Sequence, residues 1–163
     1  MNPFARLLAI SRRKSPWVYS AGAGSCNGCD IEIGPCGTPR YDAEQIGMLR
    51  QGSPKHADIL LITGVLNKRM HPVVLEIYRQ MPSPKAVVAL GSCPASGNVF
   101  EGSPLIDGPV DKLIPVDVWV PGCPPRPQLI IEGVAQAARL LADGRTADQR
   151  QTAARRTEER ASW

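Results

Sequence analysis

Residues 86–94 read AVVALGSCP, a short apolar run with two β-branched valines that ends in a glycine and then a cysteine. Two further runs have the same form, DILLIT at residues 58–63 and VDVWV at residues 116–120, and each is closely followed by a glycine. Near-continuous apolarity over so few residues is typical of a parallel strand that is covered on both faces. We therefore expect buried strands at 58–63, 86–90 and 116–120.

Two stretches have the spacing of amphipathic helices. Residues 70–81 place apolar side chains at helical spacing, and residues 127–142 repeat them every three or four positions, with Pro127 at a favourable first helical position. The segment 17–20 is expected as a further edge or first strand. The order strand, helix, strand, loop, strand, helix predicts an α/β fold: an open parallel sheet with right-handed crossovers and helices on both faces.

The composition fits one compact domain with many turns. Of 163 residues, 43% are hydrophobic and 21% charged, while 15 are glycine and 16 are proline. No run approaches the roughly 18 apolar residues that a membrane-spanning helix needs. We expect the globular domain at 15–144, between a basic amphipathic N-terminal segment, 1–14, and a polar C-terminal tail, 145–163.

Positive charge is concentrated at the two ends of the chain. Residues 1–14 carry four basic side chains and no acidic one, and residues 145–163 carry five arginines and three acidic side chains. The domain between them has ten basic and twelve acidic residues, which argues against a groove for nucleic acid. The N-terminal segment is expected to form a short helix that lies on a partner or on a bilayer surface, and the tail a frayed helix or disordered chain.

A twin arginine, Arg12-Arg13, is not followed by the long apolar stretch of a signal peptide. We therefore expect no export signal and a reducing, cytoplasmic compartment. Disulfides are disfavoured there, and clustered cysteines more often bind metal.

Four of the five cysteines follow a pattern. Cys26 and Cys29 form a C-x-x-C motif after a Gly-rich loop. Cys93 and Cys123 each come just past a predicted strand, in the sequences GSCP at 91–94 and GCP at 122–124. The carboxyl ends of parallel strands meet at one edge of a sheet, where open α/β folds bind their ligands. Four thiolates that converge there are a ligand set for a 4Fe–4S cluster or a structural zinc ion.

The spacing of the cysteines favours an iron–sulfur cluster, and a structural zinc ion or a redox-active C-x-x-C motif stays open as an alternative. Structural zinc usually holds together a small irregular domain through two tight pairs of ligands, whereas these cysteines are spread over a chain that has its own sheet and core. A thioredoxin-like redox C-x-x-C would leave Cys93 and Cys123 unexplained. Cys36 has no strand end to place it and is expected to be a buried free thiol.

Five motifs lie along the chain in a fixed order: SCNGCDIE at 25–32, TPRYD at 38–42, GSPKHADILLITG at 52–64, GSCP at 91–94 and PVDVWVPGCPPRP at 115–127. Together they closely resemble the small, cluster-bearing subunit of membrane-bound group 4 NiFe hydrogenases, whose family includes the 20 kDa subunit of respiratory complex I. The resemblance runs from about Trp17 to Ala142. It implies a flavodoxin-like fold and one 4Fe–4S cluster at the carboxyl ends of the strands, with Cys26, Cys29, Cys93 and Cys123 as ligands.

Two departures refine the resemblance. The complex I branch usually has adjacent cysteines where this chain has the C-x-x-C of hydrogenase-type members. Periplasmic uptake hydrogenases carry an export signal and extra cysteines, so this chain looks like the short one-cluster form. Related chains in complexes that reduce quinones or sulfur species share much of the pattern.

The resemblance implies an electron-transfer subunit of an oxidoreductase complex, without a complete active site or catalytic residue of its own. It would relay electrons between a large NiFe-type catalytic subunit and a ferredoxin-like multi-cluster subunit, docked peripherally on integral membrane subunits at the cytoplasmic side. The alternative is the equivalent subunit of a complex I-type quinone or sulfur-reducing oxidoreductase. Glu32 matches an acidic family residue that relays protons or tunes the cluster, although it also fits an exposed carboxylate at a helix start.

Overall fold

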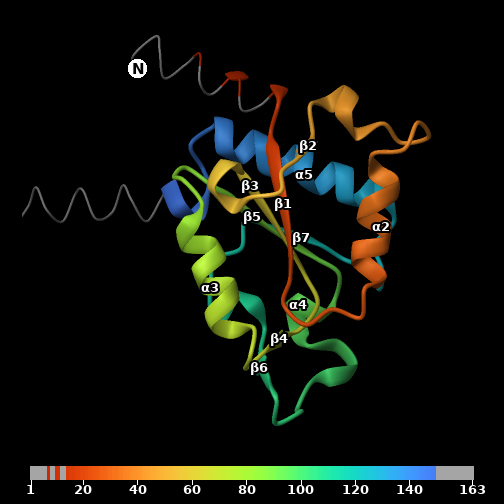
Figure 1. Cartoon of the computed structure of the whole chain (residues 1–163), viewed down its shortest axis with the longest axis vertical. Helices are drawn as coiled ribbons and strands as arrows, with labels where there is room; N and C mark the ends of the chain where they lie inside the picture. Colours follow the sequence, from red (N-terminus) through yellow and green to blue (C-terminus); the bar gives the residue numbers. More distant parts are fainter. Residues whose placement is uncertain (1–6, 8–9, 12–13, 150–163) are drawn as a thin grey trace, which may run out of the picture.

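A computed structural model describes residues 7, 10–11 and 14–149 of the chain (Figure 1). Of the basic N-terminal segment 1–14, where a short helix is expected, the structure describes residues 7, 10–11 and 14, and these are helical. The tail from residue 150 onward lies outside the described residues. Within the described part, no helix is long and apolar enough to cross a membrane.

The centre of the structure is a sheet of five parallel strands in the order β2-β1-β3-β5-β7 (Figure 1). The strands are β1 (Trp17–Gly22), β2 (Leu49–Arg50), β3 (Ile59–Thr63), β5 (Ala86–Leu90) and β7 (Val118–Val120). Numbered among themselves, they follow the order 2-1-3-4-5 of flavodoxin-like doubly wound folds. The predicted flavodoxin-like open parallel sheet is confirmed.

The predicted strands are present with small differences at their ends. β5 has the predicted limits, whereas β7 begins later than residue 116 because the carboxylate of Asp117 occupies a ladder position. Its Oδ2 atom accepts a hydrogen bond from the backbone nitrogen of Val87 at 2.9 Å, where a strand carbonyl would otherwise accept. The segment from Trp17 is the first strand, β1, and it lies inside the sheet between β2 and β3 rather than at an edge.

Helices cover both faces of the sheet. α2 (Gly28–Cys36) and α5 (Pro127–Ala142) pack together on one face, and α3 (His71–Gln80) covers the other (Figure 1). Successive residues of β3 point to opposite faces of the sheet. Leu61 packs in the hydrophobic core on the α2 and α5 side, and Leu60 packs in the core on the α3 side. This burial on both faces explains why the strands are apolar throughout.

Lys85 fixes the end of α3. Its side chain is 6% exposed, and its ammonium group donates hydrogen bonds to the carbonyl oxygens of Tyr78, at 2.7 Å, and Met81, at 3.1 Å. The ammonium nitrogen also lies 4.1 Å from the centroid of the Tyr78 ring. Carbonyl groups at a helix C-terminus have no intrahelical donor, so Lys85 supplies one between α3 and β5.

Short elements surround the carboxyl end of the sheet, at the bottom of Figure 1. They are α4 (Cys93–Ser96) and an antiparallel ribbon of β4 (Leu66–Asn67) and β6 (Ile106–Gly108). These elements were not predicted, because stretches of two to four residues are too short to show a hydrophobic period.

The chain stays packed after α5. Thr146 and Ala147 are buried, and the backbone nitrogen of Ala147 donates to Oδ1 of Asp117 at 2.6 Å. The first residues of the expected C-terminal tail therefore contact the start of β7.

Candidate functional site

Four of the five cysteines line one cavity at the carboxyl end of the sheet. The cavity has a volume of about 110 Å3, and its walls include Cys26, Cys29, Cys93 and Cys123, all of them free thiols. Three strands position them: β1 leads to Cys26 and Cys29, β5 to Cys93, and β7 to Cys123. The structure thus brings together the four cysteines that the sequence predicts as ligands.

A left-handed turn after β1 directs the first two thiols to the cavity. Asn27 has φ 68°, a conformation that asparagine tolerates better than most residues, and α2 begins at the next residue. Cys29 therefore lies in the first turn of α2, where it is 9% exposed and its thiol donates to the carbonyl oxygen of Leu90 at 3.7 Å. Cys26, on the loop, is exposed.

Glycines let the backbone pass close to the thiol-bearing loops. Gly64, after β3, has φ +78°, and a Cβ atom there would lie 2.4 Å from the backbone nitrogen of Ser25. Gly122, before Cys123, has φ +143°, and its Cβ atom would lie 2.6 Å from Cα of Pro125. Only glycine fits both positions, so part of the cavity wall is bare backbone.

The loops that carry Cys93 and Cys123 are hydrogen-bonded to each other. The backbone nitrogen and the hydroxyl group of Ser92 donate to the carbonyl oxygen of Gly122, at 2.9 and 3.3 Å. These bonds continue the pairing of β5 with β7 past the strand ends, and so fix the two loops side by side.

Asn98 donates toward two of the thiols. Its side-chain nitrogen Nδ2 lies 3.5 Å from Sγ of Cys123 and 3.9 Å from Sγ of Cys93. Asn98 was not predicted as a site residue from the sequence. The pair Gly97-Asn98 could have indicated it, because this pair favours a left-handed turn just after the Cys93 loop, and both residues do have positive φ.

Asp30 was also missed, and two hydroxyl groups hold it beside the cavity. The Ser25 hydroxyl donates to Oδ2 at 2.6 Å, and the hydroxyl of the buried Thr63 donates to Oδ1 at 2.9 Å. The position of Asp30 directly after the second cysteine of the C-x-x-C motif could have indicated that it lies near the site.

Burial makes the inner thiols hard to ionise. It raises the pKa of Cys29 to about 11, with smaller contributions from the charges of Cys93 and Asp30. It also raises the pKa of Cys93, and the hydrogen bond from Asn98 opposes that rise. Thiolates in such a place need positive charge nearby, which a bound metal centre supplies.

The donor set fits an iron–sulfur cluster better than a single ion. Within the described ranges, no three His, Cys, Asp or Glu side chains come together closely enough to ligate one metal ion. A structural zinc ion needs its cysteine sulfurs at about 2.3 Å from one point. The four thiols instead surround a volume, and a 4Fe–4S cluster takes four thiolates around its own bulk.

Cys36 and Glu32 lie outside this cavity. Cys36 is buried between α2 and α5, and its thiol donates to the carbonyl oxygens of Glu32, at 3.5 Å, and Pro127, at 3.7 Å. The side chain of Glu32 is half-buried on α2. Neither residue is part of the wall formed by the other four cysteines.

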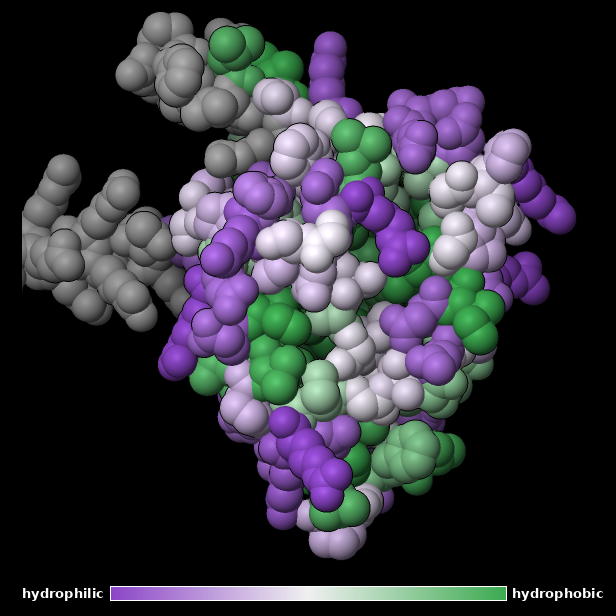
Figure 2. Space-filling model, viewed as in Figure 1, coloured by the Kyte–Doolittle hydropathy of each residue, from purple (hydrophilic) through white to green (hydrophobic). Residues whose placement is uncertain are grey.

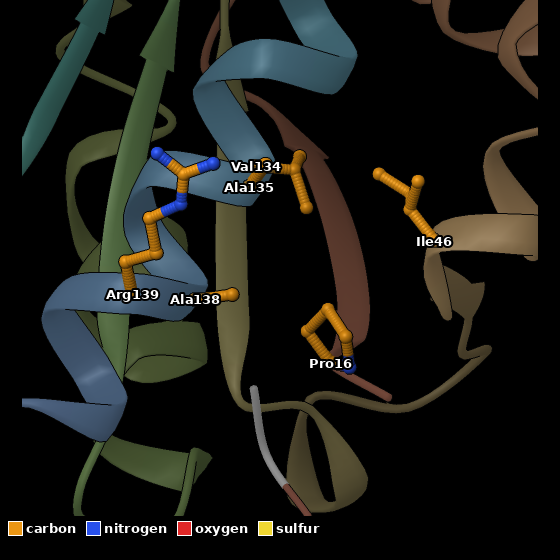
Figure 3. Close-up of a pocket in the computed structure, with 6 residues that line it drawn as sticks. All are labelled: Pro16, Ile46, Val134, Ala135, Ala138 and Arg139. Atoms are coloured by element: carbon orange, nitrogen blue, oxygen red, sulfur yellow. The ribbon is translucent and has the colours of Figure 1, made fainter. Parts of the chain in front are cut away.

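A second hollow, of about 220 Å3, lies at the opposite end of β1. Figure 3 shows Pro16 and Ile46 facing Val134 and Ala138 of α5 across it. Its lining contains no cysteine, so it is separate from the thiol-lined cavity.

Comparison with known families gives one match over most of the domain. The sequence profile described as "NADH ubiquinone oxidoreductase, 20 Kd subunit" matches residues 26–137, a range that contains all four cavity cysteines.

Two relatives and one solved structure illustrate the range of similar proteins. The "probable membrane-bound hydrogenase subunit mbhJ" of Pyrococcus furiosus is 56% identical over 130 residues, which cover 79% of this chain and 77% of the relative. An NADH-quinone oxidoreductase subunit of Citrifermentans bemidjiense is 37% identical over 139 residues, covering 85% and 79%. A chain in the structure of "the membrane-bound sulfane sulfur reductase (MBS), an archaeal respiratory membrane complex" superposes with a TM-score of 0.74 at 35% identity, covering 85% of this chain and 77% of that one.

Proposed function

This chain belongs to the family of the 20 kDa subunit of NADH ubiquinone oxidoreductase, and we propose that it is the electron-transfer subunit of a membrane-bound NiFe hydrogenase complex. The proposal depends chiefly on one observation, the four free thiols around a single cavity. Cys26, Cys29, Cys93 and Cys123 hold one 4Fe–4S cluster. When bound, the cluster supplies one-electron transfer at a potential set by its surroundings.

The residues of this chain bind, enclose and tune the cluster. Cys29 is the buried ligand, and the hydrogen-bonded loops of Cys93 and Cys123 supply two further ligands to the same cavity. Glu32, half-buried on α2, acts as a proton relay or as a charge that tunes the potential. Substrate chemistry belongs to a partner, since this subunit contributes electron transfer rather than a catalytic residue.

The cluster end of the molecule is the face for the large catalytic subunit. Apolar side chains are exposed there beside the ligand loops: Ile31 by 68%, Val99 by 81%, Phe100 by 45% and Leu105 by 70%. Figure 2 shows apolar surface at this lower end of the view. Apolar groups grouped around a redox centre suit a partner that covers them and brings its own centre within electron-transfer distance.

The similar proteins support two kinds of complex. The relative from Pyrococcus furiosus is named as a hydrogenase subunit, which favours a NiFe-bearing large subunit and a ferredoxin-like subunit as partners. The structural similarity to the sulfane sulfur reductase supports the second candidate, the equivalent subunit of a sulfur- or quinone-reducing complex. In either case the chain is a peripheral subunit on the cytoplasmic side of integral membrane subunits.

Metal analysis of the full-length chain tests the proposal. Purified without oxygen, it should be brown, with about four irons per chain and a matching amount of sulfide. A colourless chain with one zinc and no iron would overturn the redox function.

Purification of the intact complex separates the two candidates. A hydrogenase complex contains nickel and produces or consumes hydrogen, whereas a complex without nickel that reduces sulfane sulfur or quinone would establish the alternative.

A further inference from the structure

We propose that Asn98 is a positioning residue that sets the reduction potential of the cluster through hydrogen bonds to Cys93 and Cys123. The inference rests on the proposed function, because it requires both cysteines to be thiolate ligands. It adds a residue outside the cysteine motifs, and it gives the loop after α4 a role beyond connecting α4 to β6.

The geometry supplies one donor group for two sulfurs. Nδ2 of Asn98 lies 3.5 Å from Sγ of Cys123 and 3.9 Å from Sγ of Cys93. Both distances suit hydrogen bonds to sulfur, which is larger than oxygen. An asparagine amide has two N–H bonds and a ligating thiolate can only accept, so the nitrogen and not the carbonyl oxygen must face the two sulfurs.

The backbone holds this amide in place. Gly97, with φ 86°, and Asn98, with φ 50°, form a left-handed turn directly after α4. The hydroxyl of Ser96 accepts a hydrogen bond from the backbone nitrogen of Asn98 at 3.2 Å. Cys93 is the first residue of α4, and Asn98 lies just after the end of that helix. The amide of Asn98 and the sulfur of Cys93 are therefore separated by only one helical turn and the left-handed turn that follows it.

Reduction adds one electron, and so one negative charge, to the cluster and its thiolates. A donor that points at two ligand sulfurs stabilises the reduced form more than the oxidised form. Loss of the amide should therefore make reduction less favourable.

Redox titration of the reconstituted full-length chain tests this role, with the reduced cluster followed by EPR. In Asn98→Gly, which keeps the left-handed backbone and removes both donors, the ratio of reduced to oxidised cluster at a fixed ambient potential should fall about tenfold, or about 59 mV for one electron. Asn98→Asp, which replaces donors with a negative charge, should lower the ratio further. Iron content should stay at the wild-type level.

Asp42→Gly is the matched control. Asp42 also has positive φ, but it is not part of the cavity wall, and the hydrogen bonds to the thiols come from Asn98. The potential of this variant should match that of the wild type. An unchanged potential in cluster-loaded Asn98→Gly, or loss of iron from both Asn98 variants while Asp42→Gly keeps its iron, would overturn the tuning role alone. A wild-type chain that binds zinc and no iron would overturn the proposed function and, with it, this inference.

Discussion

Gly91 faces Cys29 so closely that a Cβ atom on Gly91 would lie 2.9 Å from the sulfur. Gly91 directly follows β5, and its φ of +90° is a backbone conformation that residues with a side chain rarely adopt. The same hypothetical atom would lie 3.2 Å from the carbonyl oxygen of Gly122, so there is little room for it to move. The most buried of the four cavity thiols is therefore packed against a position that must lack a side chain.

Gly91→Ala should damage the site through this contact. We expect a loss of stability of about 1–3 kcal/mol from steric overlap and backbone strain, together with reduced iron per chain. Gly34→Ala in α2 is the control, because nothing lies within 4 Å of its Cβ position and its φ is not positive. Thermal unfolding and iron assays measure both effects, and equal results for the two variants would contradict the prediction.

Serine substitutions distinguish the four ligand cysteines from Cys36, which is buried but is not a ligand. Cys26→Ser, Cys29→Ser, Cys93→Ser and Cys123→Ser should each lower iron content and visible absorption, because a serine hydroxyl is a poor ligand for the cluster. Cys36→Ser should keep both near the wild-type level and cost about 1 kcal/mol of stability, since a polar group replaces a thiol in the core. The assignment is wrong if Cys36→Ser bleaches the protein and Cys29→Ser does not.

Lys85→Met should destabilise the domain without affecting the cluster. It removes the side-chain donor to the carbonyl oxygens of Tyr78, which is partly buried, and Met81, which is buried, at the end of α3. The expected loss is about 1–3 kcal/mol in urea unfolding. Lys55→Met, at an exposed position, should change stability by less than about 0.5 kcal/mol. Equal midpoints for the two variants would refute a structural role for Lys85.

Deletion of residues 1–13 should loosen the complex from membranes in a salt-dependent way. The segment is basic, and each Lys or Arg near an anionic surface contributes about 1 kcal/mol. The deletion spares Lys14, because the backbone of Lys14 packs against Gly47. Flotation at increasing salt, with the cluster spectrum as a check on integrity, measures the effect. A truncated complex that stays membrane-bound at high salt rules out this role.

The buried strands and helices could be predicted because their apolar residues follow a clear pattern along the sequence. β5 and the helix α5 have the predicted limits, since continuous apolar runs and a three-four repeat leave few alternatives. The convergence of Cys93 and Cys123 with the C-x-x-C motif followed from parallel strand order alone.

The residues around the thiols were less predictable. Asn98 reaches the sulfurs only because two successive residues adopt positive φ, and Asp30 is fixed by hydroxyl groups from two other segments. Such contacts depend on the path of a loop, which hydrophobic periodicity does not encode. β2, β4 and β6 were missed for a related reason, since two or three residues are stabilised by their neighbours rather than by their own pattern.

The distribution of the cavity cysteines over three strand ends has a consequence for biosynthesis. Cys26 leaves the ribosome long before Cys123, and the two meet only after β7 has paired with β5 at the far side of the sheet. In the proposed holo-protein, cluster insertion therefore follows completion of the domain, and a nascent or truncated chain offers no more than three of the four ligands. Once inserted, the cluster closes a loop that spans most of the chain, which lowers the entropy of the unfolded state as a long-range cross-link does. Cluster loading would thus act as a maturation checkpoint that distinguishes finished subunits from incomplete ones.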